Sequence, residues 1–181
     1  MSKPHLIGLA GKKGVGKDTV ASILVKEHGY LAMAFADPVR AALSTIFNTP
    51  VEAFTDPATK ERLSSFFFDR TPRYLMQTLG TEWGRSMVNQ DIWTVLLKRR
   101  ISAALEQGQH VVVTDIRFNN EARALLGIGA VVVGVTRPGS FYEPDIHSSE
   151  QGVELALHSL FLDNKGSIDD LREAVRELVL L

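Results

Sequence analysis

The sequence lacks cysteine and has almost no net charge. Because none of its 181 residues is cysteine, disulfide bonds, thiolate metal sites and cysteine nucleophiles are excluded. The formal net charge is -1 at pH 7, which argues against a general binder of nucleic acid or of acidic membranes. A polyanionic ligand would therefore have to be recognised by a local cluster of basic residues.

Long hydrophobic runs are missing as well. No apolar run approaches the length of a membrane span. The short run near the N-terminus is followed by Lys12 and Lys13, which is unlike a signal peptide. With 45% hydrophobic and 23% charged residues, the composition is that of a globular protein, and the length predicts a single domain over residues 1–181. The expected location is the cytoplasm.

The most informative segment lies between residues 5 and 19. An apolar run ends in a glycine-rich turn, and an amphipathic segment begins at Lys17. The spacing Gly11-x-x-x-x-Gly16-Lys17 is that of a phosphate-binding loop of the Walker A type. Its glycines let backbone N–H groups approach phosphate oxygens, and the lysine reaches the β- and γ-phosphates. The expected contacts with a nucleoside triphosphate are Gly11, Lys13, Gly14, Val15, Gly16, Lys17, Asp18 and Thr19.

The residue after the lysine departs from the usual pattern. A Ser or Thr that binds Mg²⁺ is typical there, whereas this chain has Asp18 and places the hydroxyl of Thr19 one residue later. A carboxylate is also a hard-oxygen ligand for Mg²⁺. Asp115 is the last residue of a later apolar run, residues 110–115, and suits the role of a Walker B acid. We therefore expect Mg²⁺ near Asp18 and Asp115, and the alternative of a glycine-rich turn without nucleotide stays open.

Five apolar segments alternate with amphipathic ones along the chain. Strands are expected at residues 5–10, 30–36, 110–115, 130–136 and 157–162. This alternation predicts a three-layer α/β fold with a five-stranded parallel sheet flanked by helices. Ligands bind such sheets at the carboxyl ends of the strands. Those ends are expected to carry the glycine-rich loop, Asp37, Asp115, Arg117, Arg137 and Asn164.

The middle of the chain, residues 37–90, carries the candidate acceptor residues. Asp37 is expected to cap a helix that starts at Pro38, and Thr71 a helix that starts at Pro72. Residues 48–68 are irregular, and Phe66, Phe67 and Phe68 are expected to pack, with the stacking of one of them against a base left open. Arg73 and Gln77 lie four residues apart and therefore share a helix face, as contacts with a phosphate and a base edge would require. The alternative, two polar residues on a solvated face, stays open.

The chain has more arginines in these segments than a triphosphate alone requires. They are Arg40, Arg70, Arg73, Arg117 and Arg137. This surplus favours two phosphorylated ligands and a transfer between them, in which the protein mainly positions groups and neutralises charge. A phosphate acceptor is already an anion and needs no general base. An ATPase without an acceptor and a non-catalytic nucleotide-binding module remain as alternatives.

Several motifs together resemble a known family. They are Gly16-Lys17-Asp18-Thr19, Arg73-x-Leu75-Met76-Gln77-x-Leu79-Gly80-Thr81, Asp115-x-Arg117-x-x-x-Glu121, Arg137-Pro138-Gly139 and His147-x-Ser149-Glu150. From about residue 5 to its C-terminus the sequence resembles the phage-type deoxynucleoside monophosphate kinases. The resemblance implies a P-loop kinase fold with an acceptor-binding segment at about 37–90 and a lid at about 137–150. It also implies phosphorylation of a deoxynucleoside monophosphate with ATP and Mg²⁺.

The resemblance also implies roles for individual residues. Lys17, Arg117 and Arg137 would be catalytic, and Asn164 and Gly166 would lie by the adenine. The acceptor site would comprise Asp37, Arg40, Arg70, Arg73, Gln77, Thr81, Trp83 and Asp115. A bulky side chain, Trp83 or Tyr74, is our hypothesis for the exclusion of ribose.

The expected partners are small-molecule nucleotides, with no nucleic acid polymer and no membrane. A homodimer is left open, and the cytoplasm would be that of the host if the chain is phage-encoded. A kinase of another small phosphorylated acceptor, such as dephospho-coenzyme A or phosphomevalonate, would share every phosphate contact and stays the nearest alternative.

Overall fold

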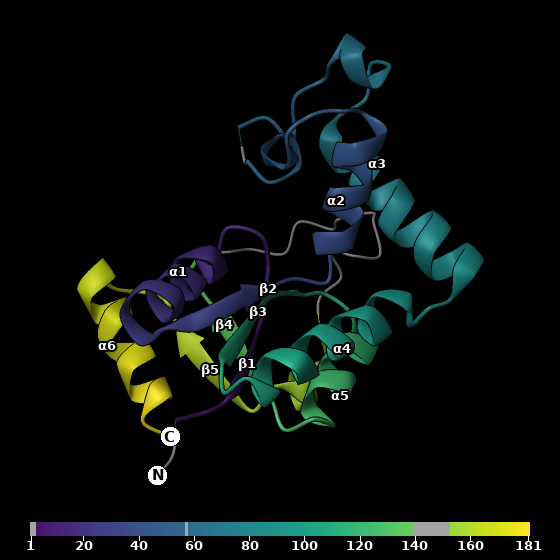
Figure 1. Ribbon diagram of the computed structural model, residues 1–181. Helices are drawn as coiled ribbons and strands as arrows, with labels where there is room; N and C mark the ends of the chain where they lie inside the picture. Colours follow the sequence, from purple (N-terminus) through teal and green to yellow (C-terminus); the bar gives the residue numbers. More distant parts are fainter. Residues whose placement is uncertain (1–2, 57, 140–152) are drawn as a thin grey trace. The chain divides into compact units, whose positions relative to one another are not determined.

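The structure is a computed structural model that describes residues 3–56, 58–139 and 153–181 (Figure 1). The chain forms two compact units, Met1–Ala34 with Leu96–Leu181, and Phe35–Val95. The acceptor-binding segment expected at 37–90 falls within the second unit. Most of the lid expected at 137–150 lies outside the described residues, as do His147, Ser149 and Glu150 of the quoted motif. No helix in the described part of the chain is both long and apolar enough to cross a membrane.

The first unit contains a five-stranded parallel sheet, as expected from the apolar segments. Its strands are β1 (Leu6–Ala10), β2 (Tyr30–Met33), β3 (His110–Ile116), β4 (Val131–Thr136) and β5 (Leu160–Asp163). Their order across the sheet is β2-β3-β1-β4-β5, and every neighbouring pair is parallel. All five residues of β1 are buried, which explains why the strand is a continuous apolar run rather than an alternating one.

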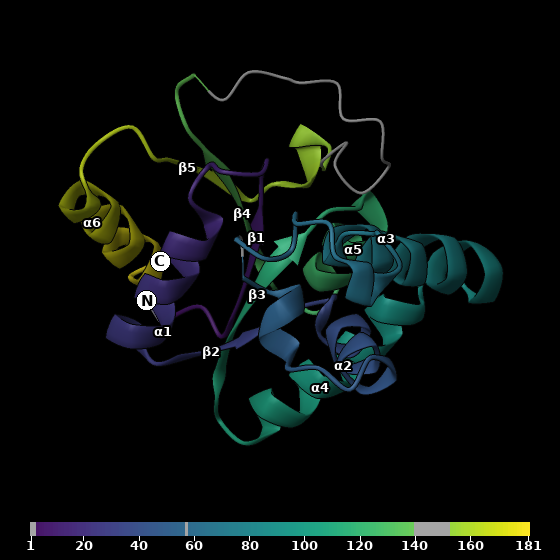
Figure 2. The ribbon, with the colours of Figure 1, turned by 90° about the horizontal axis from the view of Figure 1, so that it is seen from above.

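Helices cover both faces of this sheet and complete the three layers (Figure 2). α1 (Lys17–His28) and α6 (Ile168–Val179) lie on one face, and α4 (Ile92–Glu106) and α5 (Asn119–Leu126) lie on the other. The α1 and α6 side has a continuous apolar core that includes Leu9, Val20 and Val175. The three-layer α/β fold predicted from the alternation is therefore confirmed.

The N-terminus of α6 has the capping box that its sequence predicts. The Ser167 hydroxyl accepts the backbone N–H of Asp170 at 3.2 Å, and the Asp170 carboxylate accepts the backbone N–H of Ser167 at 2.7 Å. The Ser167 side chain also donates to Asp170, and these hydrogen bonds lower the pKa of this carboxyl group. The exchange satisfies two backbone N–H groups that the helix itself leaves without partners.

The second unit is built from short helices. They are α2 (Asp37–Ile46), the 3-10 helices η1 (Val51–Phe54) and η2 (Ser65–Phe67), α3 (Pro72–Gln77) and the π-helix η3 (Thr78–Val88). Phe54 and Phe67 are buried and in ring contact, and the more exposed Phe66 and Phe68 contact the rings of Phe67 and Phe47, so these side chains pack together as expected. The Thr71 hydroxyl accepts the backbone N–H of Tyr74 at 3.1 Å, which confirms the predicted cap of α3.

Two predicted features at the start of the second unit are wrong. β2 ends at Met33 rather than at residue 36, because its pairing with β3 ends where Met33 meets Val113. Ala34 and Phe35 are buried without being part of the strand, so hydrophobicity alone extends the apparent strand too far. Asp37 therefore does not end a strand, and it is the first residue of α2, with Ala36 at the N-cap position.

The π-helix η3 was not predicted from the sequence. The Trp93 indole N–H donates to the Gly80 carbonyl at 2.7 Å. A Cβ atom on Gly84 would lie 2.4 Å from the Trp93 ring, so only glycine leaves the space that the ring fills. This anchoring depends on a side chain 13 residues beyond Gly80, which lies outside the helix itself. Helical periodicity carries no information about such a contact.

Candidate functional site

The glycine-rich loop between β1 and α1 surrounds the Lys17 ammonium group. Lys17 Nζ donates to the Gly11 carbonyl at 2.6 Å and to the Lys12 carbonyl at 2.7 Å. The φ angles of Gly11, Gly14 and Gly16 are 140°, 81° and 105°, a region that favours glycine. Three glycines thus let the chain turn between β1 and α1, in the strand–loop–helix order that the sequence motif predicts, and the loop's own carbonyls hold the Lys17 ammonium group.

The loop is anchored against the sheet and the core. A Cβ atom on Gly11 would lie 2.4 Å from the backbone oxygen of Val135 in β4, so the loop passes too close to this strand for any other residue. The Val15 side chain is 2% exposed and belongs to the core between the sheet and α1. These contacts hold the loop rigidly above the end of β1.

The glycine-rich loop leads directly into the N-terminus of α1. Gly16 occupies the N-cap position and makes no side-chain cap hydrogen bond, so no side chain of the cap residue competes with an anion at this helix N-terminus. Asp18 lies in the first turn, and Asp18 and Thr19 are exposed. The loop, the lysine and the helix dipole therefore favour negative charge at this position, whereas the Asp18 carboxylate opposes it.

The end of β3 contributes Asp115 and Arg117 beside this loop. β3 pairs with β1, and Ile116 lies opposite Ala10, so the two strands end at the same edge. Both side chains are partly exposed. They reach the edge at which parallel sheets bind ligands.

Glu121 supports the turn after β3. It is 3% exposed, and its Oε2 accepts the backbone N–H groups of Arg117 at 2.9 Å and of Phe118 at 3.1 Å. In the sequence Glu121 belongs to the motif Asp115-x-Arg117-x-x-x-Glu121, which by itself predicts no role for this residue. The four-residue spacing between Arg117 and Glu121 could have indicated this role, because a carboxylate at that distance can accept the backbone N–H groups at the start of a helix.

The remaining strands of the first unit bring two more predicted residues to this edge. Arg137 directly follows β4 and Asn164 directly follows β5, and these strands are paired up to Thr136 and Asp163. The Asn164 side chain donates to the Val15 carbonyl of the glycine-rich loop at 2.9 Å. A Cβ atom on Gly166 would lie 2.4 Å from the Asp170 carboxylate, so this glycine makes room for the capping box.

The predicted acceptor residues other than Asp115 lie in the second unit. Arg40 pairs with Asp37 at 3.1 Å, and its buried Nε has no hydrogen-bond partner among the described residues. Arg73 lies on α3 with Gln77, and its Nε donates to Glu61 at 2.6 Å. The Arg70 guanidinium lies 4.8 Å from the centre of the Tyr74 ring.

Two further residues expected at the acceptor site lie on the π-helix η3. Thr81 is partly exposed, and the Trp83 side chain is 45% exposed. π-helical segments are rare and are frequently found at functional sites. The second unit thus offers arginines, an amide and an accessible indole, which are groups suited to a phosphorylated aromatic ligand.

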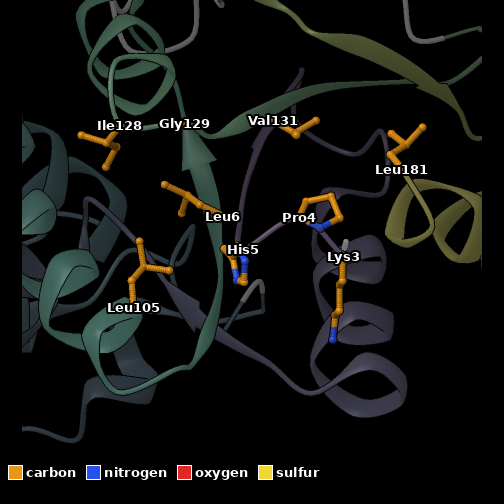
Figure 3. Close-up of a pocket in the computed structure, with 9 residues that line it drawn as sticks. All are labelled: Lys3, Pro4, His5, Leu6, Leu105, Ile128, Gly129, Val131 and Leu181. Atoms are coloured by element: carbon orange, nitrogen blue, oxygen red, sulfur yellow. The ribbon is translucent and has the colours of Figure 1, made fainter. Parts of the chain in front are cut away.

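A hollow of about 620 Å³ lies at the opposite edge of the sheet (Figure 3). Apolar residues at the strand starts, including Leu6 and Val131, line it together with Lys3 and His5. None of the predicted site residues belongs to this lining. The predicted residues of the first unit that follow strand ends therefore lie away from this hollow.

Comparison with protein families gives one match over more than half of the chain. The model of the family described as deoxynucleotide monophosphate kinase matches residues 69–175. This range includes Arg70, Gln77, Asp115 and Asn164, and therefore residues from both units.

Comparison with individual proteins gives relatives of the same kind. A protein of Acanthamoeba polyphaga mimivirus, named provisionally as a deoxynucleotide monophosphate kinase, is 30% identical over 176 residues, covering 91% of this chain and 91% of its own length. The deoxynucleoside-5'-monophosphate kinase of Escherichia phage T5 is 34% identical over 101 residues. That match covers 52% of this chain and 40% of the phage protein, so the chain spans less than half of that relative's length.

Among solved structures, dephospho-CoA kinase from Campylobacter jejuni has a similar fold. The TM-score is 0.54 at 11% sequence identity, over 97% of this chain and 96% of that chain. Identity at this level supports the shared fold of P-loop kinases and carries no information about the substrate.

Proposed function

The chain belongs to the deoxynucleotide monophosphate kinase family, and we propose that it transfers the γ-phosphoryl group of ATP to a deoxynucleoside monophosphate. The observation that carries this proposal is the Lys17 ammonium held inside the glycine-rich loop at the carboxyl edge of the sheet. A triphosphate bound there would meet a cation, backbone N–H groups and a helix N-terminus, which together stabilise the charge that phosphoryl transfer redistributes.

The proposed reaction balances without a general base. An anionic oxygen of the acceptor phosphate forms a bond to the γ-phosphorus as the bond between that phosphorus and the β,γ-bridging oxygen breaks. The bridging oxygen keeps the electron pair, and the products are ADP and a deoxynucleoside diphosphate. Lys17, Arg117 and Arg137 would neutralise charge on the transferred group and on the leaving phosphate.

Asp18 and Asp115 fit the requirements of Mg²⁺. Both are hard-oxygen donors beside the proposed phosphate site, and magnesium commonly takes one or two carboxylates together with phosphate oxygens and water. No group of three or more His, Asp or Glu side chains in the described part of the chain could hold a metal by itself, so substrate phosphates would complete the coordination. Bound Mg²⁺ would neutralise phosphate charge.

The acceptor would be bound by residues of the second unit. Arg40, Arg70 and Arg73 suit its phosphate, and Gln77 suits a base edge. The buried Arg40 Nε without a described partner is in keeping with a bound anion. Trp83 and Tyr74, each 45% exposed, are accessible for contact with the sugar. We also expect a cytoplasmic enzyme that acts on small nucleotides, either as a monomer or as a homodimer.

The test is an ADP-release assay with ATP and Mg²⁺ that compares the four common deoxynucleoside monophosphates with their ribose counterparts. We expect ADP to form only with one or a few deoxynucleotides, in equal amount to the diphosphate product. ADP formation without any acceptor would instead indicate an ATPase. No turnover with any nucleotide would reject the proposed acceptor and favour a kinase of another phosphorylated small molecule, such as dephospho-coenzyme A.

A further inference from the structure

Asn164 connects the loop after β5 with the glycine-rich loop. Its side-chain Nδ2 donates to the Val15 carbonyl at 2.9 Å, across 149 positions of the sequence. Its backbone N–H donates to the Thr136 carbonyl at 2.8 Å and so extends the pairing of β4 with β5. Because the sheet fixes the backbone of Asn164, the direction in which its amide approaches the loop is fixed as well.

The contact of Asn164 with the Val15 carbonyl is so close that only glycine fits at position 16. A Cβ atom on Gly16 would lie 2.3 Å from Asn164 Nδ2, and Gly16 has a φ of 105°. The Val15 side chain is buried in the core on the other side of the same residue. The peptide group between Val15 and Gly16 is therefore held in two ways: its carbonyl oxygen accepts the Asn164 amide, and the Val15 side chain is fixed in the core.

This arrangement sets the direction of a backbone donor. In a trans peptide the N–H points opposite to the C=O, and no peptide among the described residues is cis. With the Val15 carbonyl directed at Asn164, the Gly16 N–H must point away from it. Gly16 belongs to the loop whose N–H groups we assign to the phosphates, so Asn164 orients one of those donors.

We infer that Asn164 is a positioning residue for the polyphosphate of the nucleotide, acting through the glycine-rich loop rather than by contact with the base. The inference rests on the proposed function, since it assumes that the loop binds phosphates. It separates two roles for a residue that the family resemblance would place beside adenine. A positioning role affects every ligand that carries the phosphates, whereas base recognition affects only ligands that carry the base.

Inorganic tripolyphosphate is the probe that distinguishes these roles, because it has the phosphates without a base. Calorimetric titration with Mg²⁺ should compare the wild-type chain with Asn164→Ala, using ATP, GTP and tripolyphosphate. We expect Asn164→Ala to weaken the binding of ATP and the binding of tripolyphosphate by the same factor. This factor is about 5-fold, which corresponds to the loss of one hydrogen bond. The ratio of ATP to GTP affinity should not change. Gln109→Ala, which removes an exposed amide before β3 at the opposite edge of the sheet, is the control and should match the wild type.

A second variant tests the connection through the loop. Gly16→Ala places a methyl group against the Asn164 amide, so removal of Asn164 should weaken tripolyphosphate binding less in this background than in the wild type. The inference is overturned if the two effects are additive. It is also overturned if Asn164→Ala leaves tripolyphosphate affinity unchanged, whether or not ATP affinity falls. A wild-type chain that binds neither ATP nor tripolyphosphate would reject the proposed function, and the inference with it.

Discussion

At the scale of single residues, Lys17 is the charge on which the proposed phosphate site depends. Two loop carbonyls hold its ammonium group, at 2.6 and 2.7 Å, where the triphosphate is expected. We predict that Lys17→Ala lowers kcat for ADP formation by about 100-fold or more, the usual cost of removing one preorganised donor from a transition state. Lys26→Ala, which removes an exposed lysine from the last turn of α1, is the matched control and should retain full activity. Equal activity of the two variants would contradict the assignment.

Glu121 supports the turn that carries Arg117. Its carboxylate accepts two backbone N–H groups, so Glu121→Ala should lower the free energy of unfolding by about 2–4 kcal/mol through two unsatisfied donors. Glu121→Gln retains an acceptor oxygen and should lose less than half of that amount. Urea denaturation measures both values. Equal losses in the two variants would show that the charge of Glu121, rather than its acceptor oxygen, is what the fold requires.

At the scale of elements, the loop between β1 and α1 offers a matched pair of glycines. Gly11 and Gly14 both have positive φ, but only Gly11 lacks space, with a Cβ atom 2.4 Å from the Val135 backbone oxygen. We predict that Gly14→Ala costs about 1 kcal/mol of stability from backbone strain alone, and that Gly11→Ala costs at least about 3 kcal/mol. Thermal denaturation of both variants tests the difference. Similar costs would show that the loop can move away from β4.

The π-helix η3 is the element whose geometry depends on Trp93. Trp93→Phe keeps an aromatic ring beside Gly84 but removes the donor to the Gly80 carbonyl, so stability should fall by about 1 kcal/mol. Because η3 carries Thr81 and Trp83, KM for the acceptor should rise more than KM for ATP. Met87→Ala, a change at a 77% exposed side chain of the same helix, is the control and should alter neither KM. An equal rise in both KM values after Trp93→Phe would contradict this division of roles.

At the scale of the whole molecule, stability should fall in alkaline solution because of Tyr30. Burial raises the pKa of Tyr30 from 10.0 to about 12, and its hydroxyl donates to the Pro4 carbonyl at 2.6 Å. Between these two pKa values the unfolded chain has lost this proton while the folded chain retains it. The free energy of unfolding should therefore decrease from about pH 10 to about pH 12, by about 3 kcal/mol in total.

The control for this effect is Tyr30→Phe, which removes the titrating group and keeps the ring. The unfolding free energy of the wild type minus that of the variant should be constant below about pH 9 and should fall by about 3 kcal/mol between about pH 10 and pH 12. Urea denaturation at a series of pH values measures this difference. A constant difference up to pH 12 would show that the Tyr30 hydroxyl titrates equally in both states.

The sequence alone determined the features that depend on neighbouring residues. Apolar runs predicted the five strands, and the fully buried β1 is the plainest case, because a strand buried on both faces has little polar surface. The bounds were less exact for β5, which begins at Leu160 rather than at residue 157, since Leu155–Leu157 forms a 3-10 helix. The glycine spacing predicted the loop between β1 and α1, since positive φ is a local property, and Ser167 with Asp170 predicted the start of α6. The alternation of apolar and amphipathic segments predicted the fold, and the motifs of the sequence, above all Arg73 to Thr81, indicated the kinase family.

Only the tertiary structure decided the contacts that join distant segments. The hydrogen bond of Asn164 to Val15 spans 149 positions, and the anchoring of η3 by Trp93 requires a side chain from another helix. The early end of β2 followed from its pairing with β3 rather than from hydrophobicity. Such contacts are set by the order and register of packed elements, which local propensities do not contain. The sequence therefore identified the chemical groups, and the packing decided which of them support one another.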